Sequence, residues 1–228
     1  VSSQFAANGE ITVNTGDQKV LATTEKIGKL TALRIGSEAQ PILAKKGDDL
    51  RIDWGYLYVS ANRAQATGSL NAGMDGPVAG NTVEATLKFS NFKVGAKPVS
   101  RWLMVAYDDL YSIQYMRHNL RPYWRRNGWE AADLLKAAAK DYPSLVKRCA
   151  AFDTELMADL TRNGGEQYAK IAALAYRQCF AAGKFVADDH GQPIQFCKEN
   201  HSNGCIGTSD VFYPMVPQFL LFGPSLSK

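Results

Sequence analysis

The polar segment at residues 195–217 holds the side chains most suited to acid–base chemistry. Its sequence is Q-F-C-K-E-N-H-S-N-G-C-I-G-T-S-D-V-F-Y-P-M-V-P. The carboxylates Glu199 and Asp210 are candidate general acids or bases, and the amides of Asn200 and Asn203 can hold a polar substrate by hydrogen bonds. The same composition is also typical of a solvated loop that leads into a helix, with Asp210 or the residue before it as the N-cap.

A second pair of carboxylates, Asp108 and Asp109, follows the apolar run R-W-L-M-V-A-Y. In a functional role, one of the two carboxylates faces Glu199 across a pocket. In a structural role, both aspartates cap a helix N-terminus, where the helix dipole favours negative charge. We expect a helix directly after them.

Arg121 and Trp124 are the candidate contacts for an anionic or planar part of a substrate. Arg121 lies near Arg125 and Arg126, an arrangement that suits an anion site or a solvated helix face. Trp124 belongs to a group of aromatic residues that could line a cleft or pack in a core. The group consists of Tyr107, Tyr111, Tyr115, Tyr123, Trp124 and Trp129.

The histidines and cysteines give weaker signals. His201, beside Glu199, is a further acid–base candidate, whereas a Ser202–His201–Asp210 triad lacks the supporting G-x-S-x-G elbow. Cys197 and Cys205 enclose a single histidine, which is a poor zinc pattern, so we expect no metal and no cofactor. These two cysteines could form a short disulfide or stay unpaired. Cys149 and Cys179 lie on apolar helix stripes, and we expect both to be buried thiols.

Composition places the chain among ordinary globular proteins. It has 228 residues, of which 46% are hydrophobic and 21% charged, and a formal net charge of +4. This charge is too small and too dispersed to indicate a nucleic-acid or membrane partner. No apolar run is long enough to span a membrane, and the first residues, V-S-S-Q-F-A-A-N-G-E, do not resemble a signal peptide.

The elements that must position these residues change character near residue 106. Short, partly alternating runs at 20–23, 30–35, 50–54, 56–59 and 83–89 predict strands of an antiparallel sandwich. The run at 101–107 predicts a strand buried on both faces. The sequence is compatible with either a loop or a short helix at residues 62–70.

Helical periodicity dominates after Tyr107. We expect a helix at 129–141 that ends before Pro143, a second helix from Pro143 to the Asn163-Gly164-Gly165 stop, and a third at 166–183. The second and third form an αα-hairpin. A β-hairpin is expected at 185–196, and a last helix at 210–222 in spite of two prolines. The expected fold class is α+β, with sheets first and helices after.

Three stretches resemble the glutaminase A-like protein family. They are K-K-G-D-D-L-R-I-D-W-G-Y-L-Y-V from Lys45 to Val59, V-A-Y-D-D-L-Y-S-I-Q-Y-M-R-H-N-L-R-P-Y-W-R-R-N-G from Val105 to Gly128, and K-E-N-H-S-N-G-x-I-G-T-x-D-V-x-Y-P in the polar segment. They occur in family order and span most of the chain.

The resemblance implies a β-sandwich portion at residues 1–106 and the first helices of an (α/α) toroid at 107–228, as a fragment of a several-fold longer protein. It implies hydrolysis of L-glutamine to L-glutamate and ammonia, with Glu199, Asp109 and Asp210 as catalytic candidates. The substrate-binding candidates are Asp108, Arg121, Trp124, Asn200 and Asn203. It also implies a secreted or periplasmic location and contacts with the rest of the parent chain.

Two alternatives remain at this point. Helical toroids frequently carry paired carboxylates for glycoside hydrolysis, and Asp109 with Glu199 would then be the acid and base acting on a sugar. The chain could otherwise be an inactive structural piece, for which open apolar surface on the last helix would be a sign.

Overall fold

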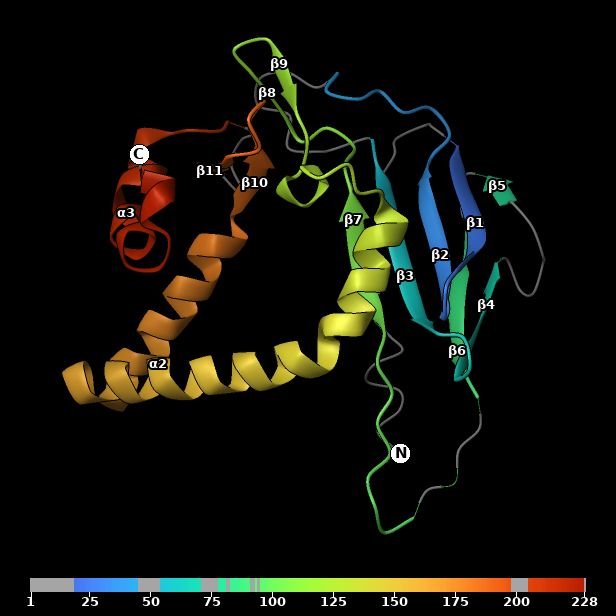
Figure 1. Cartoon of the computed structure of the whole chain (residues 1–228), viewed down its shortest axis with the longest axis horizontal. Coiled ribbons are helices and arrows are strands. Elements are labelled where there is room, and N and C mark those ends of the chain that lie inside the picture. Colours follow the sequence, from blue (N-terminus) through green and yellow to red (C-terminus); the bar gives the residue numbers. More distant parts are fainter. Residues whose placement is uncertain are drawn as a thin grey trace. The chain divides into compact units, whose positions relative to one another are not determined.

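Antiparallel strands build the first part of the protein in this computed structural model, which describes residues 19–44, 54–70, 78–80, 83–90, 93, 95–197 and 205–227. The chain divides into two units. The first holds the described residues up to Ile42 and from Trp54 to Tyr107, and the second holds Leu43, Ala44 and the described residues from Asp108 onward (Figure 1). The first sheet has five strands in the order β5-β1-β2-β3-β7. Its strands are β1 (Val20–Ile27), β2 (Leu30–Ser37), β3 (Tyr56–Asn62), β5 (Val78–Gly80) and β7 (Met104–Asp108).

A second, two-stranded sheet packs on the first. It pairs β4 (Ala66–Leu70) antiparallel with β6 (Ala85–Phe89). Ala22, Leu33 and Leu70 are fully buried between the two sheets, and partly buried residues of β2 and β6 pack around them. The predicted antiparallel layers are therefore confirmed, and the segment left open at 62–70 contributes the end of β3, a turn and β4.

The prediction that residues 101–107 form a strand buried on both faces is wrong. β7 covers only the end of this run, and it lies at the edge of the sheet beside β3. The exposed fraction of Val105 is 53%, whereas Met104 and Ala106 are half-buried. An edge strand is covered on one face here, so its apolar residues alternate between the core and the surface.

The helix expected directly after Asp109 is absent, and a β-hairpin stands in its place. β8 (Ile113–Tyr115) pairs antiparallel with β9 (His118–Leu120) through a two-residue turn. Both turn residues, Met116 and Arg117, have positive φ angles of 49° and 68°, as a type I′ hairpin turn requires. Ile113 and Leu120 are buried against Val186 and Phe196, so tertiary packing outweighs the helical spacing of the sequence.

The long helix α2 (Ala131–Ala181) forms most of the second unit. Gly165 interrupts it with φ 79° and ψ 174°, so the predicted stop at Asn163-Gly164-Gly165 and the αα-hairpin are confirmed. The ring centres of Phe152 on the first arm and Tyr176 on the second arm lie 5.8 Å apart. The expected helix end before Pro143 is wrong, because α2 continues through that proline. Figure 1 shows α2 bending in its first half, the usual consequence of a proline inside a helix.

The remaining elements agree with expectation. β10 (Gly183–Ala187) and β11 (Pro193–Cys197) form the predicted hairpin, and α3 (Ser209–Phe222) contains both prolines without ending at either. The described residues also contain two short 3₁₀ helices, η2 (Tyr123–Arg125) and η3 (Pro224–Ser227). None of the helices among the described residues is long and apolar enough to cross a membrane.

Candidate functional site

Asp108 is held by a buried arginine. The Nε of Arg125 donates to Asp108 Oδ1 at 3.0 Å, and its second terminal nitrogen contacts Oδ2 of the same carboxylate. The Asp108 and Arg125 side chains are almost fully buried. Two parallel contacts between a guanidinium and a carboxylate fix the orientation of both groups. We call Asp108, Arg125 and Glu130 the Asp108 clamp.

The outer partner of the clamp is Glu130. Its Oε2 accepts from the second side of the Arg125 guanidinium at 2.6 Å, and its side chain is largely exposed. Burial by itself would lower the pKa of Arg125. The hydrogen bonds and charges of Asp108 and Glu130 outweigh burial, and the pKa of Arg125 is therefore raised above its ordinary value.

Asp109, the next residue, belongs to a different network. Its exposed fraction is 0%, Ser112 Oγ donates to its Oδ1 at 3.0 Å, and Lys184 Nζ forms an ion pair with its Oδ2. The Lys184 side chain keeps 31% of its surface exposed. We call Asp109, Ser112 and Lys184 the Asp109 cluster. Its lysine reaches the surface, whereas the arginine of the Asp108 clamp does not.

A strained turn follows the two carboxylates. Leu110 has a positive φ of 58°, and its N–H donates to Asp108 Oδ1 at 3.0 Å. The next N–H, from Tyr111, donates to the backbone oxygen of Asp109 at 2.5 Å. A left-handed conformation at a leucine costs about 1–2 kcal/mol. Such a conformation persists only where neighbouring contacts determine it, as the two aspartate networks do here.

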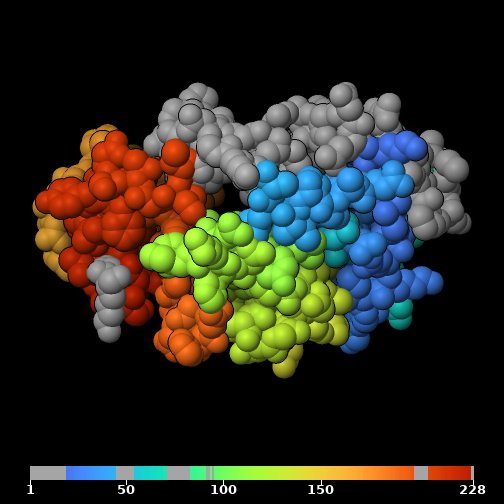
Figure 2. Space-filling view, turned by 90° about the horizontal axis from the view of Figure 1, so that it is seen from above, coloured from blue at the N-terminus to red at the C-terminus, as the bar shows by residue number. Residues whose placement is uncertain are grey.

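The β10–β11 hairpin brings Lys184 to Asp109. Val186 forms a β-bridge with Pro122, and the rings of Phe185 and Tyr123 lie 4.6 Å apart. In Figure 2 the surface of β10 and β11 (orange) lies directly beside that of the segment after Asp108 (yellow-green). In the hairpin register, Lys184 pairs with Phe196 and Gly183 pairs with Cys197. The first residues of the polar segment, 195–197, thus belong to β11 and pair with residues 183–185 of β10.

Arg121 and Trp124 lie beside these networks. Arg121 is partly exposed. Its guanidinium carbon lies 5.5 Å from the centre of the Tyr111 ring, and one terminal nitrogen lies 3.8 Å from Glu130 Oε1. Its Nε also donates to the Leu110 carbonyl at 3.4 Å. The guanidinium of Arg125 lies 4.7 Å from the centre of a Trp124 ring. Trp124 therefore covers the Asp108 clamp.

Comparison with known proteins identifies the family. Residues 1–159 match the family described as Domain of unknown function (DUF5127), and residues 165–228 match the Glutaminase A six helical-hairpin domain. The chain belongs to the glutaminase A family.

Two curated relatives are similar to part of this glutaminase A family chain. Over 105 residues it is 31% identical to Glutaminase A of Aspergillus oryzae, an alignment that covers 46% of the chain and 15% of the relative. Over 105 residues it is 29% identical to "Probable glutaminase/05536" of Arthroderma benhamiae, covering 46% of the chain and 12% of the relative. The matched region is thus a small part of each relative's length. No solved structure matches the chain. The predicted domain boundary near residue 106 stays a prediction.

Among the predicted site residues of this family member, the structure brings Asp108, Asp109, Arg121 and Trp124 into one region. Asp210 lies exposed in the first turn of α3, and the N-cap of that helix is Thr208. Glu199, Asn200, His201, Ser202 and Asn203 lie outside the described residues. Their predicted roles, and those of the four residues in the cluster region, stay predictions.

Sequence reasoning missed Lys184, Ser112 and Glu130. A lysine in a short strand is typical of a solvent-facing position, and Arg125 was considered only as part of an anion site or a solvated face. The signal that could have found them is charge balance: two buried carboxylates need cationic or hydrogen-bonding partners nearby.

Of the histidines, His118 and His190 lie in the described residues, and neither belongs to the Asp108 clamp or the Asp109 cluster. His118 pairs with Asp189 at 3.0 Å on the surface, and His190 is exposed, as expected for a hairpin turn. Cys179 is buried as predicted, but Cys149 is exposed, so the prediction for Cys149 is wrong. Residues 141–150 of this arm of α2 are exposed. No group of three possible metal ligands occurs among the described residues.

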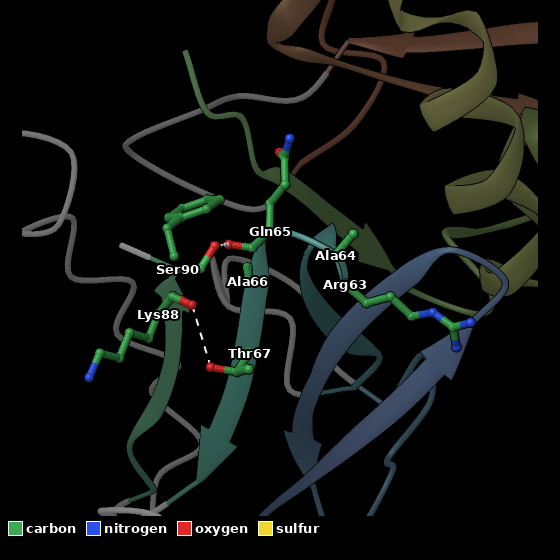
Figure 3. A pocket seen from close by; sticks show the side chains of 8 residues that line it. Arg63, Ala64, Gln65, Ala66, Thr67, Lys88 and Ser90 are labelled. Atoms are coloured by element: carbon green, nitrogen blue, oxygen red, sulfur yellow. Dashed lines mark hydrogen bonds between the residues drawn. The ribbon is translucent and has the colours of Figure 1, made fainter. Parts of the chain in front are cut away.

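A separate hollow lies in the first unit. It measures about 330 Å³ and is lined by residues of β4, β6 and their ends, including Gln65, Thr67, Lys88 and Ser90 (Figure 3). Ser90 Oγ donates to the Gln65 carbonyl at 3.1 Å, and Thr67 Oγ1 donates to the Lys88 carbonyl at 3.5 Å. These hydroxyl groups are therefore already hydrogen-bonded to backbone carbonyls of the strand ends. Neither Asp108 nor Asp109 lines the hollow.

Proposed function

We propose that this chain is a segment of a glutaminase-like amidohydrolase that converts L-glutamine to L-glutamate and ammonia. The observation that carries the proposal is the similarity to Glutaminase A of Aspergillus oryzae. Because the chain corresponds to a small part of that relative, the activity is proposed for a longer protein that contains this segment.

Amide hydrolysis needs an activated water or nucleophile, donors for the developing oxyanion, and an acid that protonates the leaving ammonia. Lys184 supports this chemistry, since one side of its ammonium is held by buried Asp109 while its side chain still reaches the surface. In the proposed site Lys184 donates to the oxyanion or to the leaving nitrogen. Asp109 positions it, and Glu199 activates water.

The substrate's own charges need partners as well. Arg121 is partly exposed and can pair with the α-carboxylate of glutamine, and Asn200 and Asn203 supply amide hydrogen bonds. Asp210, exposed at the start of α3, is the remaining carboxylate for the α-ammonium group. Asp108 accepts hydrogen bonds from Arg125 and from the Leu110 N–H. These contacts support a second role for Asp108, in addition to the predicted substrate contact: it holds the turn after the two aspartates in position.

We also propose that the second unit packs against other parts of a longer chain. The exposed fractions of Leu221 on α3 and Ile171 on α2 are 72% and 70%, and Leu220, Tyr213 and Leu174 are also largely exposed. Exposed apolar side chains gathered on two neighbouring helices are a usual sign of a surface that another part of the protein covers. From the family resemblance we propose a location outside the cytoplasm, which fractionation of the producing cells would test.

The test is the release of ammonia and glutamate from L-glutamine by the longer protein, by this chain alone, and by two variants of the longer protein. Glu199→Gln is expected to lower turnover by about 100-fold or more, because it removes an acid–base group. Glu166→Gln, an exposed glutamate on α2, is the matched control and is expected to keep the parental rate. We expect this chain alone to be inactive.

Each other outcome redirects the proposal. Parental turnover by Glu199→Gln removes Glu199 from the mechanism. An inactive longer protein overturns the glutaminase function. Release of sugar from glycoside substrates by the same preparation would then favour the alternative, a glycoside hydrolase with Asp109 and Glu199 as its proposed acid and base.

A further inference from the structure

Two buried thiols lie together where α2 ends and β11 ends. The exposed fractions of Cys179 and Cys197 are 8% and 0%, and both belong to one apolar cluster with buried Phe219. Phe180, Met215 and Leu226 pack around this cluster. The sequence offered Cys205 as the partner of Cys197, but Cys197 is a thiol that lies against Cys179.

The local backbone explains why these two cysteines meet. Cys179 lies in the last turn of α2, where Ala182 N–H donates to the Gln178 carbonyl at 2.9 Å. The chain then enters β10 at Gly183, whose partner across the hairpin is Cys197. The hairpin thus returns Cys197 to a position beside the end of the helix. The Cys179 thiol is near enough to act electrostatically on Cys197.

We propose that Cys179 and Cys197 form a disulfide when the protein folds in the presence of a small-molecule or protein disulfide. One cysteine thiolate attacks a sulfur of the oxidant and releases a thiol. The second cysteine then attacks the mixed disulfide and releases the other thiol. Two electrons and two protons pass from the cysteines to the oxidant, and the Cys179–Cys197 bond remains.

The timing of this reaction follows from burial. Burial, with a smaller effect of Cys179, raises the pKa of Cys197 to about 11, and burial also raises the pKa of Cys179. Only the thiolate takes part in exchange, so the folded pair reacts slowly at neutral pH. Oxidation therefore takes place while the chain folds, before Phe219 covers the two sulfurs.

The bond would have a defined structural effect. It would tie the end of α2 to Cys197, the last residue of β11, within the polar segment. Closing a loop of this length typically stabilises a protein, since it restricts the unfolded chain. This inference does not depend on the proposed glutaminase function.

Tryptic digestion gives an unambiguous readout, because all four cysteines fall on different tryptic peptides. Cys149 lies on 149–162, Cys179 on 178–184, Cys197 on 185–198 and Cys205 on 199–228. The full chain is refolded in a buffer of reduced and oxidised glutathione, remaining thiols are alkylated, and the non-reduced digest is analysed by mass spectrometry. We expect 178–184 linked to 185–198.

Melting temperatures of the refolded chains supply the second measurement. Oxidised protein is expected to melt about 5–10 °C above the reduced protein. Cys205→Ala should keep this difference, whereas Cys179→Ala should abolish it. A link between 185–198 and 199–228, or alkylation of both 178–184 and 185–198 in the folded wild-type chain, would overturn the inference.

Discussion

The Asp108 clamp and the Asp109 cluster start from adjacent residues of one type and solve the same problem differently. Both carboxylates are buried, and each needs a cation. Asp108 has the buried, planar guanidinium of Arg125, which is bound on its other side by Glu130. Asp109 has the flexible ammonium of Lys184, which remains partly exposed. A closed arginine pair suits structure, whereas a surface-reaching lysine leaves donors for a ligand.

The clamp can be broken from its centre. Arg125→Met would leave Asp108 buried without its cation, and we expect it to lower the free energy of unfolding by about 3–5 kcal/mol. Urea unfolding of the full chain, followed by helical circular dichroism, measures this loss. Arg126→Met is the matched control, because Arg126 is exposed and should change stability by at most about 0.5 kcal/mol. Equal losses in both variants would show that the clamp does not stabilise the fold.

Cys197 extends the comparison to a buried acid that folding keeps neutral. Its pKa is raised to about 11 in the folded protein, so stability is complete below the unfolded thiol pKa of about 8.5 and is lost as pH rises from there to about 11. We expect a loss of about 2–3 kcal/mol across this window in reduced protein. The measurement is urea unfolding at stepped pH. Cys197→Ala should remove this part of the pH dependence, and an unchanged profile would contradict the expectation.

The Asp109 cluster should respond less than the clamp. Lys184→Met removes the ion-pair partner of Asp109 but leaves the Ser112 hydrogen bond and admits water at the partly exposed lysine site. We therefore expect a stability loss of about 1–2 kcal/mol. Lys184→Arg is the matched control and should keep most of the stability.

Activity separates a role in catalysis from a role in folding for the same lysine. In the longer protein we expect both Lys184 variants to bind glutamine but Lys184→Met to lower kcat by about 100-fold. The expectation is contradicted if Lys184→Met lowers the free energy of unfolding as much as Arg125→Met does and leaves kcat unchanged. Both aspartate networks would then be purely structural.

The smallest effect is expected at the outer side of the clamp. Glu130→Gln removes an exposed charge that pairs with Arg125, and exposed pairs contribute about 0.5 kcal/mol, less at high salt. Unfolding measured at low and high salt tests this. A loss close to that of Arg125→Met, insensitive to salt, would show that Glu130 and Asp108 contribute alike.

Local sequence signals succeeded where one rule governs the backbone. Gly165 breaks α2 as predicted because a left-handed residue is easily adopted by glycine, and the 185–196 hairpin forms where two apolar strands flank a polar turn. The spacing after Asp109 failed as a predictor. Residues 110–116 carry a helical pattern, but Ile113 is buried by Val186 and Phe196, which lie about 70–80 residues further along the chain.

The sequence by itself determined the fold class, the order of sheets and helices, the family, and the presence of two adjacent carboxylates. These follow from periodicity, turn residues and local motifs. Only the tertiary structure decided that Arg125 and Lys184 neutralise these carboxylates, that β7 is an edge strand, and that Cys197 meets Cys179. The partners in each case are brought together by packing between segments that are distant in the sequence. Burial raises the free-energy cost of an unpaired charge and shifts the pKa of a thiol, so the identity of the partner affects stability.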